Sequence, residues 1–491
     1  MIKFQRRKTF QEGHMGYKEG IDRKQLLLLP ASVDDYVPEY NICRLISAFT
    51  DGLDMLTLGY KYAECKSSGN RPYDPRMMLN LYIYGYLHRV RSSRRLRDET
   101  RRNIEAMWLM EGLEPDDKTI CNFRKDNAQT LKRTFREFCM VCRDEGLYGG
   151  ETVATDSVKI RANNSLKNNH NKVTVKNALA KIDKRFNEYM AALEQGDKEE
   201  SEEKQPEPEK IKIALERLKI RKEKYKKLES RLENESEVST IDTDSRLMRT
   251  GGEGRRLDVC YNVQTVVDSK HHLIAGFEVS TCSSDAGNLK AMSEMAKETM
   301  GAETLTNLAD SGYYDSDDIV ACEQDGVTCL VAKPAPGGYK KEEGFQRKDF
   351  KYDHEKDVYI CPCQKELAHK YDWKHNSGRK YHDYYNARAC RECEEKALCT
   401  KAKFRQVQRL VCQDTLDIVD ERTRKNRELY HKRQEIVEHV FGTVKAVWGY
   451  RQFLCRKKPK VTAETALAYL AYNMRRVVNI FAESRPLQAV G

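Results

Sequence analysis

The chain has 491 residues, of which 87 are Lys or Arg and 76 are Asp or Glu, giving a net charge of +11; 39% of the residues are hydrophobic. This length predicts about three domains at roughly 100–200 residues each and excludes a small disulfide scaffold. Apolar stretches are far shorter than the roughly 20 residues of a membrane helix, and the first eleven residues are too charged for a signal peptide. We therefore expect a cytoplasmic protein without a membrane partner, and the basic excess indicates an acidic one.

Residues 1–147 are predicted to form a helical, basic domain. Apolar residues follow helical spacing from Leu26 to Leu58, and Pro75 suits the first turn of the next helix. Seven arginines lie between Arg89 and Arg102, where only two acids oppose them, and this is the most basic stripe of the chain. An N-capped helix is expected over 116–125, so the two short helices have a helix-turn-helix pattern.

A change of hydrophobic period after residue 148 predicts β-strands. Five segments have strand character, with a helix between the third and the fourth. Strands and helices are mixed, with long interruptions, so we expect a mixed α/β core. The predicted strands cover residues 151–160, 259–268, 272–280, 304–309 and 327–333, and the helix covers 286–300.

Residues 171–240 interrupt this core with two helical arms around an acidic, proline-containing turn. Apolar residues recur in steps of three and four on the first arm and every seven residues on the second. This pattern predicts an antiparallel coiled-coil hairpin. Most of its Lys and Glu residues are interpreted as a solvated face, and the hairpin is one candidate for a protomer interface.

A second interruption, residues 335–412, concentrates cysteines. A Cys-x-x-Cys pair offers two thiolates at the bite that tetrahedral Zn²⁺ needs, so we predict a structural zinc knuckle, with His369 and His382 as substitute ligands. Aromatic and basic residues alternate between Tyr371 and Tyr385; a small satellite core is the preferred interpretation over a surface for distorted DNA. The candidate zinc ligands, of which four are needed, are Cys361, Cys363, Cys390, Cys393 and Cys399.

Three acids occupy positions suited to chemistry. Asp156 lies on the first predicted strand, Asp310 ends the fourth, and Glu438 lies on a long basic helix expected over 424–447. An unpaired buried carboxylate is costly, so such acids need partners or a cation. Two strand carboxylates and one helix carboxylate can hold two Mg²⁺ ions roughly 3.5–4 Å apart, an arrangement that performs phosphodiester chemistry. Taken singly, each acid is more readily interpreted as a turn or strand-end residue.

The helix of Glu438 carries further polar residues at suitable spacing. Lys445 is seven residues from Glu438, almost two turns, so both are expected on one side. Tyr430 and Arg433 lie one turn apart and are candidates for phosphate contacts. The alternative is an ordinary amphipathic helix, and both descriptions are compatible because a packed helix is a rigid platform.

Three motifs in this order resemble those of the DDE transposases of bacterial insertion sequences, which have a ribonuclease-H-like catalytic core. They are Thr155-Asp-Ser-Val-Lys159, Leu308-Ala-Asp-Ser-Gly-Tyr-Tyr314, and Tyr430-x-x-Arg433 followed by Val437-Glu-His-Val-Phe-Gly-Thr-Val-Lys445. Residues 25–39 and 73–79 resemble the N-terminal domain of that group. The resemblance covers nearly the whole chain.

The resemblance implies that Asp156, Asp310 and Glu438 are the catalytic acids and bind two Mg²⁺ or Mn²⁺ ions. The interval from Arg433 to Glu438 is one residue longer than in the best-known signature of the class, which brings Glu435 into consideration. Glu438 is preferred because its sequence context matches, whereas Glu435 faces about 60° away. The residues expected to contact DNA are Lys159, Tyr430, Arg433, Lys445, Arg89, Arg91, Arg94, Arg95 and Arg97.

Three nearby acids, Asp315, Asp317 and Asp318, are less suited to the second catalytic position. They lie beyond the turn at Gly312, and their spacing indicates a helix cap.

The predicted function is DNA transposition. The protein is expected to bind the terminal inverted repeats of its element, cleave the phosphodiester by two-metal-ion hydrolysis, and join the 3′-hydroxyl ends to target DNA in the bacterial nucleoid. Double-stranded DNA is the expected partner, with a homodimer or higher oligomer on it. The alternative is a non-catalytic DNA-binding regulator derived from a transposase, against which the intact acids argue; a coiled-coil interaction protein would account only for the hairpin.

The predicted domain division follows from these segments. It comprises an N-terminal DNA-binding domain (1–147), a catalytic core in two parts (148–170 and 241–334), the hairpin (171–240), the cysteine-rich insertion (335–412), and the catalytic and terminal helices (413–491).

Overall fold

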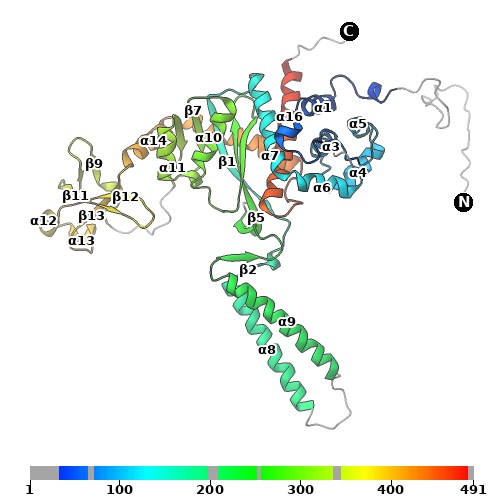
Figure 1. Ribbon diagram of the computed structural model, residues 1–491. Coiled ribbons are helices and arrows are strands. Elements are labelled where there is room, and N and C mark those ends of the chain that lie inside the picture. The colour runs from blue at the N-terminus through cyan, green and yellow to red at the C-terminus, as the bar shows by residue number, and fades with distance from the viewer. Residues whose placement is uncertain (1–31, 65–70, 197–207, 251–255, 335–343, 485–491) are drawn as a thin grey trace, which may run out of the picture.

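The computed structural model describes residues 32–64, 71–196, 208–250, 256–334 and 344–484. They form a mixed α/β fold that is about half helical. A central sheet lies beside the N-terminal helices, a long helical hairpin projects from it, and a second sheet lies at the end opposite the N-terminal helices (Figure 1). The start of the predicted helix at residues 26–31 and most of the predicted hairpin turn lie outside the described residues. Within the described ranges, no helix has the length and apolar character needed to span a membrane.

Short capped helices make up the N-terminal region. Pro75 occupies the first position of α3, and Asp74 accepts a hydrogen bond from the N–H of Arg76 at 2.7 Å. Asp116 caps α6 in the same way, through the N–H of Thr119. The helices are η1 (Val33–Tyr36), α1 (Ile42–Asp51), α2 (Met55–Leu58), α3 (Pro75–Leu87), α4 (Ser93–Arg102), α5 (Ile104–Leu109), α6 (Asp117–Asp126) and α7 (Ala128–Asp144).

These helices confirm the predicted starts at Pro75 and after Pro115. The prediction of helical structure up to Leu58 is correct only in part, because the chain breaks into α1 and α2 at Gly52–Asp54, where Asp54 starts a new cap. The arginine-rich α4 and the capped α6 pack against each other, but α5 lies between them in the chain. The helix pair is therefore not joined by a single turn.

The central sheet has the strand order β4-β5-β1-β7-β8, with β6 also paired to β5. The neighbour β5 is antiparallel to β1 and to β6, whereas β7 and β8 run parallel to β1. All five predicted strands are present, and β4 is an additional one. The strands are β1 (Thr152–Arg161), β4 (Arg246–Arg249), β5 (Leu257–Asp268), β6 (Ile274–Ser280), β7 (Leu305–Ala309) and β8 (Val327–Val331).

Helices cover both faces of this sheet. On one face lies α10 (Leu289–Met300), where Asn307 of β7 joins Thr155 of β1 to Ser293 of α10 by hydrogen bonds of 2.9 and 2.8 Å. On the other lies α16 (Lys458–Ser484), whose Tyr469 hydroxyl is 2.8 Å from that of Thr265 on β5. The helix α11 (Ser316–Gln324) connects β7 to β8.

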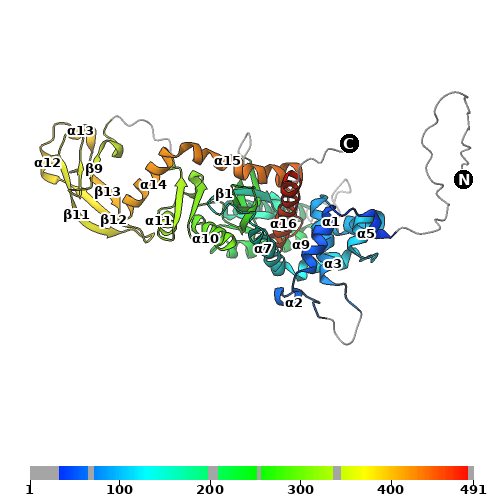
Figure 2. The same ribbon diagram turned by 90° about the horizontal axis from the view of Figure 1, so that it is seen from above.

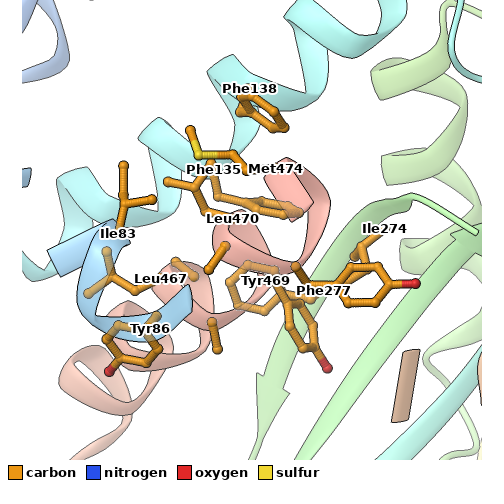
Figure 3. Close-up of a cluster of buried hydrophobic side chains, with 14 of the residues drawn as sticks. Ile83, Tyr86, Phe135, Phe138, Ile274, Phe277, Leu467, Tyr469, Leu470 and Met474 are labelled. Atoms are coloured by element: carbon orange, nitrogen blue, oxygen red, sulfur yellow. The ribbon is translucent and has the colours of Figure 1, made fainter. Parts of the chain in front are cut away.

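The last described helix, α16, joins the N-terminal region to the sheet. Its Leu467, Tyr469, Leu470 and Met474 lie between side chains of α3 and α7 on one side and β6 on the other (Figure 3). Asn473 completes the edge of β6, because its side-chain amide exchanges two hydrogen bonds of 2.9 Å with the backbone of Ile274. One continuous core therefore spans the N-terminal helices and the central sheet.

The segment between β1 and β5 contains the helical hairpin. The helices α8 (Lys172–Gly196) and α9 (Pro208–Arg231) lie side by side and project away from the sheet (Figure 1). Lys222 of α9 pairs with Asp183 of α8 at 2.6 Å. At the base, β2 (Asn169–Asn171) and β3 (Glu237–Ser239) form a short antiparallel ribbon that fixes both helix ends.

The cysteine-rich insertion forms a second sheet of five antiparallel strands, in the order β13-β12-β11-β10-β9. Trp373 stacks on Tyr381 at 4.9 Å, and Tyr384 is buried with Tyr359, which agrees with the interpretation of these aromatics as a small core. The elements are η4 (Arg347–Asp349), β9 (Lys351–Asp353), β10 (Val358–Ile360), β11 (Glu366–Lys374), β12 (Lys380–Tyr385), α12 (Ala387–Arg391), α13 (Lys396–Cys399) and β13 (Gln406–Leu410).

The helix predicted over 424–447 is formed from residue 427 onward, and an additional helix precedes it, so the chain returns to the central sheet through two helices. These are α14 (Gln413–Lys425) and α15 (Arg427–Phe441), which run in succession from the second sheet back to the first (Figure 2). Asn426 separates them, and its side chain donates to the carbonyl of Arg422, which competes with continued helix. A π-helical segment, Gly442–Val447, follows α15 directly.

Candidate active site

Two of the predicted acids lie on neighbouring strands. Thr155 of β1 pairs in parallel with Ala309 of β7, so Asp156, which continues β1, and Asp310, which directly follows β7, lie next to each other. Since side chains alternate along a strand and Thr155 faces α10, Asp156 faces the opposite side, where α15 and α16 lie. Asp310 also caps a 3₁₀ turn, η3 (Ser311–Tyr313), by accepting the N–H of Gly312 at 2.9 Å.

The helix α15 supplies a cation to this pair. Its Arg433 donates from Nη1 to Asp156 Oδ2 at 2.9 Å, and only 12% of the Arg433 side chain is exposed. The Arg433 guanidinium also lies 6.0 Å from the ring centre of Tyr430. Arg433 Nε is buried and has no hydrogen-bond partner in the described part of the chain. The predicted residues Asp156, Asp310, Arg433 and Tyr430 therefore gather at one place.

The electrostatics of the site are seen in the pKa of Asp156, which lies close to other negative charges. Burial raises the pKa of Asp156 to about 6. The N–H of Ser157 and the Arg433 guanidinium act in the opposite direction, and the charges of Asp310 and Asp285 raise the pKa further. A proton therefore competes for Asp156 near neutral pH wherever no other cation stabilises its charge.

The sequence interpretation missed Asp285, which lies in the loop before α10. Its Oδ1 accepts hydrogen bonds from Asn262 Nδ2 at 2.8 Å and from Gln264 Nε2 at 2.7 Å. The Gln264 carbonyl oxygen in turn accepts the hydroxyl of Tyr313, one turn beyond Asp310. A signal was available, because Asn262 and Gln264 are amides at alternate positions of an apolar strand and both are fully buried.

The structure does not bring Glu438 to the two aspartates. Glu438 is exposed on α15, and no group of three close metal ligands within the described ranges includes it with Asp156 and Asp310. It follows Arg433 by five residues, which places it about 140° around the helix from the side chain that reaches Asp156. The alternative acid, Glu435, points toward the β5–β6 turn, where its charge raises the pKa of His272 against the larger effect of burial.

The two predicted lysines lie together at the other end of β1. Lys159 and Lys445 both act on the pKa of the Cys260 thiol, which burial raises to about 12, so both side chains lie near this position of β5. Lys445 is half-buried, and burial lowers its pKa. The intervening π-helical turns differ from the regular α-helix that places Lys445 in line with Glu438.

The acids beyond Gly312 have structural roles, as predicted. Asp315 caps α11 through the N–H groups of Asp317 and Asp318, and it pairs with Arg379 at 2.6 Å. Asp318 accepts the N–H of Leu289 at 2.8 Å and so fixes the start of α10.

The arginine stripe divides into internal and external residues. Arg91 is held against Glu464 of α16 at 3.5 Å, donates to the carbonyl of Gln452 and stacks on Tyr450. The other predicted arginines lie on the surface or at its margin: Arg89 and Arg95 are exposed, Arg94 is 82% exposed beside Asp117, and Arg97 pairs with Asp98 and Asp117.

The five candidate zinc ligands line one small pocket of the second sheet, at whose mouth two thiols approach closely. Cys363 Sγ and Cys393 Sγ are 3.8 Å apart. Burial and the neighbouring Cys393 raise the pKa of Cys363 to about 11. The residues at this pocket include Cys361, Cys363, Cys390, Cys393 and Cys399.

The two candidate substitute histidines bind elsewhere. His369 Nε2 and His382 Nδ1 lie 2.7 and 2.5 Å from Asp372 Oδ1, so they form a separate group with a carboxylate on β11 and β12.

Two family models match the chain. One, described as a transposase domain (DUF772), matches residues 31–126, and the other, described as a transposase DDE domain, matches residues 360–478. The first covers the helices α1 to α6, and the second runs from β10 through most of α16 and includes Arg433, Glu438 and Lys445. No curated protein and no solved structure matches the chain.

Proposed function

We propose that this chain, a DDE transposase of an insertion sequence, cleaves DNA at the ends of its element and joins the released 3′-hydroxyl groups to target DNA. The observation that carries the proposal is the convergence of Asp156 and Asp310 on adjacent parallel strands beside Arg433 of the helix that the transposase DDE model covers. Carboxylates in such a position are typical ligands of Mg²⁺ or Mn²⁺.

The proposed catalytic core is ribonuclease-H-like. The mixed sheet with the acid-bearing β1 at its centre, antiparallel to one neighbour and parallel to the other, supports this assignment. In this proposal the core is divided by the α8–α9 hairpin and by the cysteine-rich sheet.

The residues have separate tasks in the proposed reaction. Asp156 and Asp310 would hold divalent cations. Glu438 would join them after a rotation of α15 about its axis or a movement of α15 on DNA binding. Such ions, two in our proposal, supply charge stabilisation for phosphodiester cleavage when bound. Arg433 neutralises Asp156 through Nη1, and its remaining donors suit a phosphate oxygen. Lys159, three residues beyond Asp156 on β1, and Lys445 would bind the DNA backbone beside the acids.

DNA recognition is proposed for the exposed arginines of α4 and its neighbourhood. Arg89, Arg94 and Arg95 are free of the core, in contrast to Arg91, whose guanidinium is engaged inside it. Cleavage at two ends requires at least two active sites, so we propose a homodimer or larger assembly on double-stranded DNA.

A structural zinc ion is proposed for the cysteine pocket. Thiolates are the donors that Zn²⁺ prefers, and five cysteines at one pocket provide the four that tetrahedral coordination needs. Cys363 and Cys393 are the first two choices because their sulfurs are already 3.8 Å apart. Such an ion would hold α12 and α13 against the second sheet.

The decisive experiment is end cleavage of a plasmid carrying the DNA that flanks the coding region, with Mg²⁺ or Mn²⁺. We expect Asp310→Asn to lower cleavage at least about 10³-fold, a loss of roughly 4 kcal/mol in transition-state stabilisation, while DNA binding persists. Asp317→Asn, an exposed carboxylate on α11, is the matched control and should cut normally.

The alternative, a non-catalytic regulator, predicts binding without cleavage by the wild type under every metal condition. If wild type binds the flanking DNA but never cuts it, or if Asp310→Asn cuts equally well, the catalytic assignment is wrong.

A further inference from the structure

A third carboxylate converges on the two aspartates, and it comes from Asp285 rather than from the helix α15. A methyl group placed on Gly312 would lie 3.0 Å from Asp310 Oδ1 and 3.5 Å from Asp285 Oδ2. The oxygens of two different aspartates therefore face one small space over Gly312. The absence of a side chain at Gly312 keeps that space open.

The orientation of Asp285 is fixed from behind. Its Oδ1 accepts two amide donors from Asn262 and Gln264, at 2.8 and 2.7 Å, and both of these residues are fully buried on β5. Because Oδ1 is occupied, the free oxygen Oδ2 is the one that faces Gly312. The backbone is held as well, since Asp318 anchors the N–H of Leu289, four residues later.

The charge balance of this space favours a cation. Arg433 is the one cationic side chain that the described residues place within ion-pair distance of any of the three aspartates, and it is used by Asp156. Neither Asp310 nor Asp285 has an ion-pair partner among the described residues.

A buried acceptor beside Asp285 gives an independent indication of a missing ligand. Asn262 Oδ1 is fully buried and has no hydrogen-bond partner within the part of the chain that the structure describes. An orphaned buried oxygen next to a carboxylate is costly in a protein interior, so the protein groups that the structure describes do not fully satisfy the surroundings of Asp285.

We propose that Asp285 is a metal-binding residue of this site, and that a divalent cation binds between Asp285 Oδ2 and Asp310 Oδ1 over Gly312. The proposal rests on the proposed function, which it extends by a carboxylate from the loop before α10. Mg²⁺ and Mn²⁺ are the expected ions because all the donors are oxygens.

The test measures binding of Mn²⁺ to the full-length, DNA-free protein by isothermal calorimetry at pH 8. Asp285→Asn keeps the acceptor Oδ1 for Asn262 and Gln264 and removes only the charge that faces Gly312. We expect it to weaken Mn²⁺ binding at least tenfold without changing the melting temperature. Asp317→Asn, the same chemical change on the exposed face of α11, should bind Mn²⁺ as the wild type does.

A second variant fills the space over Gly312 between the two carboxylates. Gly312 has no left-handed backbone conformation, so Gly312→Ala is compatible with the fold, yet its methyl group would stand between the two carboxylates. We expect Gly312→Ala to weaken Mn²⁺ binding to a similar degree. This variant keeps the proposal testable should Asp285→Asn prove unstable.

The outcomes distinguish failure of the Asp285 proposal from failure of the proposed function. If Asp310→Asn loses Mn²⁺ while Asp285→Asn and Gly312→Ala bind it like the wild type, Asp285 is not a ligand and the proposed function stands. If Asp310→Asn also binds Mn²⁺ like the wild type, the metal site fails, and the proposed function fails with it.

Discussion

Two groups of carboxylates in this protein lie in opposite surroundings. Glu464 of α16 is fully buried, accepts the N–H groups of Leu454 and Cys455 at 2.9 to 3.1 Å, and pairs with Arg91. Among the three aspartates of the candidate site, Arg433 pairs with Asp156 alone, and neither Asp310 Oδ2 nor Asp285 Oδ2 has a hydrogen-bond donor within the described residues.

This difference in available donors distinguishes an acid that stabilises the fold from acids that are suited to bind a ligand. Around Glu464 the protein supplies the donors that one buried carboxylate needs, so removal of that carboxylate leaves several groups unsatisfied. Around Asp156, burial and then the charges of Asp310 and Asp285 disfavour the ionised carboxylate, and the Arg433 guanidinium does not offset them, which costs stability until a cation binds. Carboxylate side chains therefore have opposite effects on the free energy of unfolding in the two regions.

The largest change in the free energy of unfolding is expected for replacement of Glu464. Glu464→Ala should lower the free energy of unfolding by about 3–5 kcal/mol, because Arg91 and two backbone N–H groups lose their acceptor in the core. Chemical denaturation monitored by circular dichroism measures the loss. Glu303→Ala, on an exposed loop, is the control and should change stability by less than about 0.5 kcal/mol. Equal stability of the two variants would contradict the structural role of Glu464.

Replacement of Asp156 is expected to change the free energy of unfolding in the opposite direction. The pKa of Asp156 rises from its ordinary 3.8 to about 6 on folding, so its contribution to stability is lost as the pH rises through that window. In EDTA at pH 8, Asp156→Asn should therefore raise the free energy of unfolding by roughly 1–3 kcal/mol, and below pH 4 the gain should vanish. Denaturation series at pH 4, 6 and 8 check both the size and the sign. A pH-independent effect would show that the charge of Asp156 is not the cause.

A divalent cation should relieve the same crowding. Mn²⁺ at ten times its dissociation constant is expected to stabilise the wild type by about 1.4 kcal/mol, through preferential binding to the folded state. Thermal unfolding with Mn²⁺ and with EDTA measures this difference. Asp310→Asn should show much less stabilisation, whereas stabilisation of both proteins to the same extent would place the ion elsewhere.

The smallest effect is expected for the surface arginines. Arg95→Ala should weaken DNA binding a few-fold and lower the slope of log affinity against log salt by about one, with no change in stability. Arg91→Ala is the internal comparison: it should lower the melting temperature, because Arg91 is bound to Glu464 and Gln452. Fluorescence anisotropy at several salt concentrations gives the slopes, and an unchanged slope for Arg95→Ala would remove it from the DNA surface.

Much of the core could be predicted from the sequence because it depends on local pattern. The β-branched runs of β1, β5 and β6 and the helix that begins at Pro75 are formed as expected. Asp156 and Asp310 could be singled out because Asp156 stands on a predicted strand and Asp310 ends one, where a carboxylate is unusual. The family models support the same assignment of the chain to the transposases.

What the sequence could not supply depends on tertiary contacts. Asp285 lies in a polar loop without periodicity, and it becomes part of the site only because Asn262 and Gln264 reach it across the sheet. The exposure of Glu438 depends on the rotation of α15, which is set by the packing of Val437 and Val440 against the core. The sequence interpretation also missed α14, which precedes the predicted helix and ends just before Asn426.

The position of α16 in the chain has a consequence for biosynthesis. Leu467, Tyr469 and Leu470 fill the space between the N-terminal helices and β6, so these surfaces stay open to water until the ribosome has released the last described helix (Figure 3). During translation the nascent chain therefore presents a large apolar surface that chaperones can bind. A product shortened before α16 would therefore lose part of this core and be exposed to proteolysis.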